Sequence, residues 1–184
     1  MVAEVNLLAV LRAATTNAHA RSESLLDNVA DVRTDQGYQN YLKIMFRLYQ
    51  AFGTTLDSAC VAAGLSTRSE VLLSALGSEL KVVPKTTPPA CKLSDSWGAG
   101  VGYTLEGSAL GAAVLIRRCR SSRTETEGAP FLSELSAGTR NRFKLYCDWL
   151  DAAQLEGEDA VAGALAVFES SLKAGSSLAQ RSES

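Results

Sequence analysis

The sequence contains one histidine, four cysteines, four prolines and almost no net charge. With His19 as its only imidazole, the chain cannot build a multi-histidine zinc site or a di-iron site of Glu-x-x-His pairs. A Ser-His-Asp triad, or a site with one imidazole ligand, is still allowed. The net charge of −2 over 184 residues gives no global attraction to nucleic acid or to an anionic membrane.

Long apolar runs and export signals are also missing. No apolar stretch approaches the roughly 18 residues of a membrane span, so none is predicted. The N-terminal segment has no basic region before its short apolar patch, which predicts no signal peptide. The four cysteines contain no CxxC pair, and we expect buried, reduced thiols at Cys60, Cys91, Cys119 and Cys147. These features predict a cytoplasmic protein.

Helical periodicity fills most of the chain, and no region is rich in strand signals. The periodic segments are 3–26, 35–62, a third helix that starts at Ser66 or Thr67, 94–119, 136–153 and 157–173. Thr34 is the expected N-cap of the second helix and Gly64 its end. Loops are expected at 83–90, which holds three prolines, and at 121–130. We predict an all-α fold with one helical domain over 1–175 and a flexible tail over 176–184.

The segment 98–111, GAGVGYTLEGSALG, contains five of the fourteen glycines. Each glycine inside a helix costs about 1 kcal/mol relative to alanine, so this segment gives up roughly 5 kcal/mol of helix propensity. One explanation is that a second helix packs closely against the bare backbone. The other is that a flat ligand lies on it. Gly107 and Gly111, spaced i and i+4, share one helix face.

The single histidine lies on the first helix and shares a face with Arg12, Thr15 and Glu23. Glu23 follows His19 by one turn and can accept a hydrogen bond from the imidazole, the usual second partner of a metal-ligating histidine. The alternative is a partly exposed histidine with local helix pairs. An imidazole, a nearby cation and a bare backbone are together what haem requires of a protein.

Two motifs make the chain resemble the haem oxygenases, in particular the short soluble bacterial ones. LRAATTNAHARSE at 11–23 looks like the proximal helix of that family, and YTLEGSALGAAVL at 103–115 looks like its distal helix. The resemblance implies a helical bundle of the haem-oxygenase-like type. Haem would lie between a proximal N-terminal helix and a glycine-rich, kinked distal helix.

The resemblance also implies roles for the matching residues of the proximal helix. His19 would be the ligand of the haem iron, Arg12 would meet a haem propionate, and Thr15 and Glu23 would support the proximal side.

On the distal side, the resemblance places Tyr103 against a propionate and makes Gly107 and Gly111 the wall over the haem. Ser108 stands where eukaryotic relatives have a carboxylate, so proton delivery would run through Ser108, backbone groups and ordered water. A looser match, RNRFKLYCDWL at 140–150, implies Arg142 and Lys144 as further propionate cations.

The implied activity is the oxidative cleavage of haem, both cofactor and substrate, to biliverdin with release of carbon monoxide and ferrous iron. Dioxygen is the oxidant, and electrons come from an external ferredoxin or reductase because the sequence carries no nucleotide-binding fingerprint. A bilin-binding photoreceptor is a possible acceptor of the product. The arginines that follow the glycine segment, either a docking patch for the donor or a solvated helix end, are Arg117, Arg118, Arg120 and Arg123.

Two other functions remain open. A non-catalytic haem carrier or sensor on the same fold is the main alternative, because Ser108 and Ala109 replace polar residues of relatives. The third is a protein of the same helical superfamily that binds no haem, either a thiaminase-like hydrolase or an interaction domain. Such hydrolases use an active-site thiol, and no cysteine here lies in a suggestive context.

Overall fold

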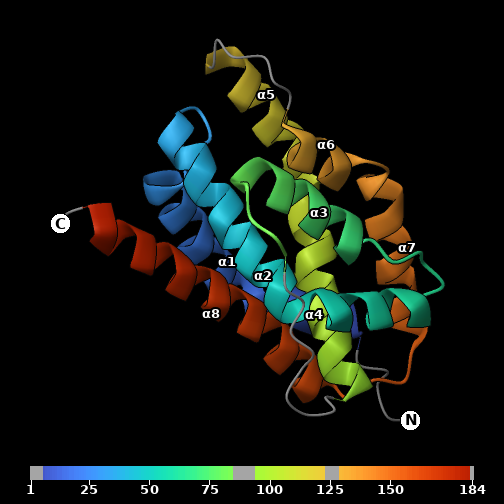
Figure 1. The fold of residues 1–184 in the computed structure, drawn as a ribbon. Helices are drawn as coiled ribbons and strands as arrows, with labels where there is room; N and C mark the ends of the chain where they lie inside the picture. The colour runs from blue at the N-terminus through green and yellow to red at the C-terminus, as the bar shows by residue number, and fades with distance from the viewer. Residues whose placement is uncertain (1–5, 85–93, 123–128, 183–184) are drawn as a thin grey trace.

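A computed structural model describes residues 6–84, 94–122 and 129–182 (Figure 1). These ranges contain helices and connecting turns but no strand, which confirms the all-α prediction. The helices are α1 (Leu7–Val29), α2 (Asp35–Ala62), α3 (Ser69–Leu80), α4 (Asp95–Ser108), α5 (Ala112–Ser122), α6 (Pro130–Ser136), α7 (Thr139–Ala152) and α8 (Gly157–Ser182). A short 3-10 turn, η1 (Ala109–Gly111), joins α4 to α5.

Helix α2 has the predicted bounds because its end signals are local in sequence. The Thr34 hydroxyl accepts a hydrogen bond from the Gly37 amide at 3.0 Å. Gly64, just after the helix, adopts the left-handed conformation, with a φ of +70°. Helix α3 begins at Ser69, later than predicted. Its first amides, of Arg68 and Ser69, donate to the Asp57 carboxylate at 3.1 and 3.2 Å. This tertiary cap lies on α2.

Two predictions about the chain after residue 120 need correction. Helix α6 was not expected, because its seven residues are too few to show periodicity; Pro130 starts it, and the Phe131 amide donates to Glu79 at 2.8 Å. The tail predicted over 176–184 continues α8 as far as Ser182, and Leu178 is buried. Residues 85–90 and 123–128 of the two expected loops lie outside the described ranges.

Helices α1 and α8 lie side by side and run in the same direction. Gly157 approaches Leu7 near their starts, and Gly175 packs on Leu25 near their ends. Helix α4 passes through the centre of the bundle and contacts α8, α2 and α7 (Figure 1). The main core lies chiefly between α2, α3, α4 and α6, and a smaller apolar cluster joins α1, α7 and α8.

One stretch of the described chain, Asp95–Ser121, is long and apolar enough by composition to cross a membrane, with a mean hydropathy of 1.3. It contains no long apolar run, because Thr104, Glu106 and Ser108 interrupt it. Half of the stretch is buried inside the bundle. A mostly buried core helix of a soluble protein passes the same test of length and composition.

Candidate functional site

The structure separates four of the five glycines of 98–111 into two groups; a methyl group on the fifth, Gly98, would make an ordinary contact with Thr55 at 3.5 Å. The first group is explained by packing. A methyl group placed on Gly100 would overlap the Ala160 carbonyl of α8, and one on Gly102 would overlap the Tyr146 hydroxyl of α7. Tyr146 in turn donates to the Ala99 carbonyl at 3.0 Å. The close-packing explanation therefore holds for the first turns of α4.

Gly107 and Gly111 form the second group. A methyl group on Gly107 would lie 3.3 Å from the Phe143 ring, whereas one on Gly111 would have no described atom within 4 Å. Gly111 is exposed and does not adopt a left-handed conformation. Neither packing nor backbone geometry in the described chain requires glycine there.

Tyr103, one turn before Gly107, connects α4 to α1. Its hydroxyl lies beside Arg12 and Thr15, two of the residues predicted for the same site. Burial raises the pKa of the Tyr103 phenol, while Arg12 and Thr15 act in the opposite direction by favouring the phenolate. Thr15 is itself buried and donates to the Leu11 carbonyl at 2.8 Å. The structure therefore brings three predicted site residues together.

His19 lies one turn beyond Thr15 on α1. Its side chain is 60% exposed, and its Nδ1 lies 3.5 Å from a Glu23 carboxylate oxygen, as the spacing predicted. The edge of the imidazole meets Phe168 of α8, with ring centroids 5.9 Å apart. Because Glu23 and Phe168 hold the ring without covering it, the imidazole is open to a ligand.

A second contact joins the same two parts of the chain further along. Arg118 of α5 lies 3.9 Å from Asp27 of α1. Tyr103 and Arg118 are 15 residues apart in the segment formed by α4, η1 and α5. Their partners, Arg12 and Asp27, are also 15 residues apart, on α1, where this separation spans about 22 Å of helix. We call the two facing stretches between these contacts, 12–27 and 103–118, the bracketed region.

The bracketed region exposes an unusual combination of groups. His19 and Glu23 lie on its α1 side. On the other side are Gly111 and two exposed aliphatic side chains, Leu110 at 46% and Val114 at 41%.

Arg142, predicted to be a propionate cation, is engaged elsewhere, and this prediction needs correction. Its Nε donates to both carboxylate oxygens of Glu106 at 3.1 Å, and its Nη2 donates to the Ser66 carbonyl at 2.7 Å. Glu106 is fully buried, and Arg68 lies 3.0 Å from it on another side. A buried carboxylate needs such partners, so the guanidinium serves the fold.

The remaining predicted residues lie on the surface. Lys144 pairs with Asp148 at 2.7 Å on an exposed part of α7, which leaves its ammonium group engaged. The exposed Ser108 donates its hydroxyl proton to the Leu105 carbonyl at 2.8 Å. Arg117 and Arg120 are exposed on α5, and Arg123 lies outside the described residues.

Sequence reasoning missed the polar cluster around Glu106. Cys60 donates its thiol proton to Glu106, with sulfur and oxygen 3.4 Å apart, and burial raises the pKa of that thiol to about 12. The Tyr49 hydroxyl is buried nearby without a hydrogen-bond partner among the described residues. A carboxylate inside the apolar stretch YTLEGSALG was the available signal.

The described residues include three buried cysteines but no cluster of metal-ligating side chains. Cys60, Cys119 and Cys147 are buried, as predicted, and Cys91 lies outside the described ranges. Burial also raises the pKa of Cys147, so neither it nor Cys60 has the character of a reactive thiolate. Within the described part of the chain, no group of three or more His, Cys, Asp or Glu side chains is placed to hold a metal ion.

Comparison of the sequence with models of known protein families finds no match, and comparison with curated proteins finds none either.

Proposed function

We propose that the protein binds haem in the bracketed region, with His19 as the iron ligand, and cleaves it oxidatively to biliverdin, carbon monoxide and ferrous iron. One observation carries this proposal. The only imidazole of the chain is 60% exposed on α1, and Gly111, in the other stretch of the bracketed region, has no described atom within 4 Å of a methyl group placed on it.

The residues present suit haem as a ligand. A haem iron takes a single neutral imidazole from the protein, so one histidine is sufficient. Arg12 and Tyr103 can meet a propionate with a charge-assisted pair and a hydrogen bond. Leu110 and Val114 offer apolar contact to the macrocycle. Arg142 and Lys144 are left out of this proposal because their charged groups already have partners.

Bound haem supplies a redox-active iron that takes up dioxygen; the chain supplies orientation and space. Glu23 faces Nδ1 of His19 and thereby directs Nε2 to the ligand position. Gly111, which has no described atom within 4 Å of an added methyl group, would leave space for the ligand, whereas the Phe143 ring lies against Gly107. The Ser108 oxygen, whose proton goes to Leu105, can accept a hydrogen bond from an ordered water.

We further propose that the electrons come from an acidic ferredoxin or reductase that docks on the exposed arginines of α5, Arg117 and Arg120. Arg118 is partly engaged by Asp27. The cytoplasm provides such donors, and a bilin-binding photoreceptor is one acceptor for the product.

Haem binding without turnover is the second candidate function. The observation that favours it is the distal stretch, where the Ser108 hydroxyl proton is already donated within the helix and Ala109 is buried. Among the described residues 103–118, no carboxylate side chain is exposed.

Titration with hemin, followed by ascorbate in air, tests both functions. The wild-type protein should give an imidazole-ligated Soret band that bleaches as biliverdin absorption grows. His19→Ala should lose that band and regain it with added imidazole, whereas Asn17→Ala, an exposed change on the same helix, should behave as wild type.

An unchanged haem spectrum in His19→Ala would refute the ligand assignment. A stable haem complex in the wild-type protein that gives no biliverdin would select the haem-binding alternative.

A further inference from the structure

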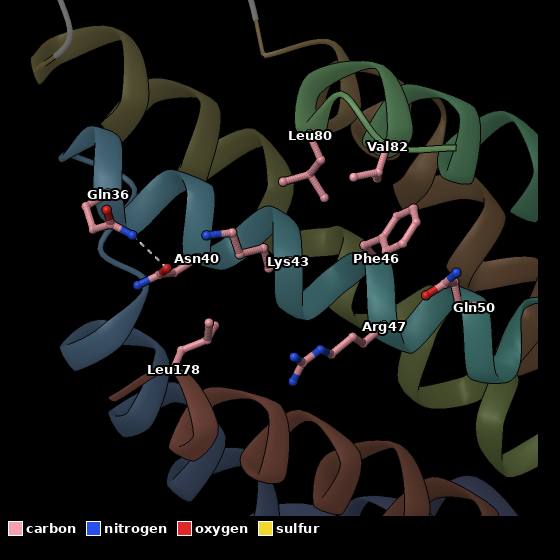
Figure 2. A pocket seen from close by; sticks show the side chains of 9 residues that line it. All are labelled: Gln36, Asn40, Lys43, Phe46, Arg47, Gln50, Leu80, Val82 and Leu178. Atoms are coloured by element: carbon pink, nitrogen blue, oxygen red, sulfur yellow. Dashed lines mark hydrogen bonds between the residues drawn. The ribbon is translucent and has the colours of Figure 1, made fainter. Parts of the chain in front are cut away.

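A groove lies on the opposite face of α2 from the main core, outside the bracketed region. It has a volume of about 720 Å³, within the range of ligand sites. Its lining runs along α2 from Gln36 to Gln50, with Leu80 and Val82 at the end of α3 and Leu178 on α8 (Figure 2). We call it the α2 groove. None of the residues proposed to contact haem lines it.

The floor of the α2 groove carries two cationic side chains. Lys43 and Arg47 are one turn apart on the same face of α2, and both are exposed. Neither forms an ion pair with any residue of the described chain. Like charges at this spacing repel each other on a helix, and an anion between them relieves that repulsion.

Acidic residues are absent from the sequence around these two cations. Residues 36–56 of α2 contain no Asp or Glu, and residues 170–182 of α8 contain none either. Position 39, one turn before Lys43, holds glutamine where a surface helix commonly has a carboxylate. The groove therefore presents uncompensated positive charge to whatever enters it.

Apolar groups flank the charges. Leu80 and Val82 lie on the α3 side, together with the half-buried ring of Phe46, and Leu178 points toward α2 from the α8 side (Figure 2). The Val82 side chain is 44% exposed. Apolar surface on both sides of a cationic floor matches a molecule that has an anionic group and an apolar body.

Asn40 fixes one end of the groove. It is buried, donates to the Val29 carbonyl at 2.8 Å, and accepts a hydrogen bond from Gln36 at 2.9 Å. These bonds hold the end of the groove in place and use the Asn40 amide. Specificity for the anion therefore falls to Lys43 and Arg47.

We propose that the α2 groove binds an amphipathic organic anion, a carboxylate on an apolar body, at a site separate from the proposed haem site. Lys43 and Arg47 hold the carboxylate, and Phe46, Val82 and Leu178 contact the apolar part.

Fluorescence titration with 11-(dansylamino)undecanoic acid tests this proposal on the full chain. The double variant Lys43→Gln/Arg47→Gln should bind the acid roughly tenfold more weakly, the loss expected for two exposed charge pairs. The matched control, Lys144→Gln/Arg140→Gln, removes one exposed lysine and one exposed arginine on α7, which does not line the groove, and should bind as wild type. The methyl ester of the probe should bind wild type as weakly as the acid binds the double variant.

Val82→Ser tests the apolar side with little risk to folding, because this side chain is already half exposed; it should weaken binding severalfold. Equal affinity of wild type for acid and ester, or equal affinities of the two double variants, would overturn the proposal. Efficient displacement of the probe by a short single-stranded oligonucleotide would also overturn it, in favour of a polyanion site.

Two variants distinguish a failure of the haem proposal from a failure of the α2-groove proposal. His19→Ala should bind the probe as wild type, and Lys43→Gln/Arg47→Gln should titrate with hemin as wild type. Probe binding lost in His19→Ala but kept in the α2-groove variant would place the probe in the bracketed region and refute the α2 site.

Discussion

At the scale of single residues, the glycines of α4 and η1 show how one residue type serves two purposes. Gly100 and Gly102 are needed because α8 and α7 approach the backbone too closely for any side chain. Gly111 has no such neighbour among the described residues. The sequence could not separate these cases, because the packing partners lie more than 40 residues away along the chain.

This difference predicts opposite effects of alanine on stability. Gly111→Ala should raise the free energy of unfolding of the haem-free protein by up to about 1 kcal/mol, since alanine is the better helix former and meets no obstacle. Gly100→Ala should lower it by about 1–3 kcal/mol through overlap with Ala160. Urea denaturation followed by circular dichroism measures both.

Equal destabilisation by the two substitutions would show that Gly111 has a packing role. If Gly111→Ala stabilises the protein as expected, the larger substitution Gly111→Leu should still allow folding but should weaken hemin binding relative to wild type.

At the scale of elements, the Glu106 cluster holds four parts of the chain together. Cys60 comes from α2, Arg68 from the turn before α3, Glu106 from α4 and Arg142 from α7. All of them meet at a fully buried carboxylate one residue before Gly107. The position of the proposed haem wall therefore depends on ion pairs between Glu106, which lies within the bracketed region, and two arginines outside it, Arg68 and Arg142.

Removing the charge of Glu106 should be costly. Glu106→Gln leaves two guanidinium groups in a buried site without their counterion, and breaking such a pair typically costs about 3–5 kcal/mol. The same carboxylate-to-amide change in Asp148→Asn affects only an exposed pair with Lys144 and should cost less than about 1 kcal/mol. Urea denaturation at neutral pH compares them, and similar losses would contradict the assigned role.

At the scale of the whole molecule, local periodicity accounts for what the sequence predicted. Helix α2 was predicted with its bounds because a regular apolar face, an N-cap and a glycine are all local signals. The start of α3, by contrast, is set by Asp57 across a tertiary contact, and α6 is too short to be periodic.

The candidate site was predictable to the same extent. His19, Glu23 and Thr15 share a face through helical spacing alone, and the pair of motifs suggested that Tyr103 lies near them. Arg142 was misassigned because nothing local shows that a guanidinium will turn toward Glu106, 36 residues earlier. Long-range polar pairing is the information that a single sequence does not carry.

Buried tyrosine and cysteine side chains should make the stability of the fold depend on pH in the alkaline range. Burial raises the pKa of Tyr41, Tyr49 and Tyr146 above 10.0 and that of Cys60 from 9.0 to about 12. The folded chain keeps these protons at pH values where the unfolded chain loses them. The stabilisation is therefore complete below about pH 9 and declines as the pH rises through 9 and 10 toward the folded pKa values.

Tyr49→Phe isolates one contribution. Its hydroxyl has no hydrogen-bond partner among the described residues, so removing it should change stability little at pH 7. At pH 11, one unit above the ordinary tyrosine pKa, wild type should have lost about 1.4 kcal/mol more than the variant. Urea denaturation at pH 7, 9 and 11 measures this difference. Parallel losses in the two proteins would mean that Tyr49 titrates in the folded state as it does in the unfolded chain, and that the buried phenol is reached by solvent.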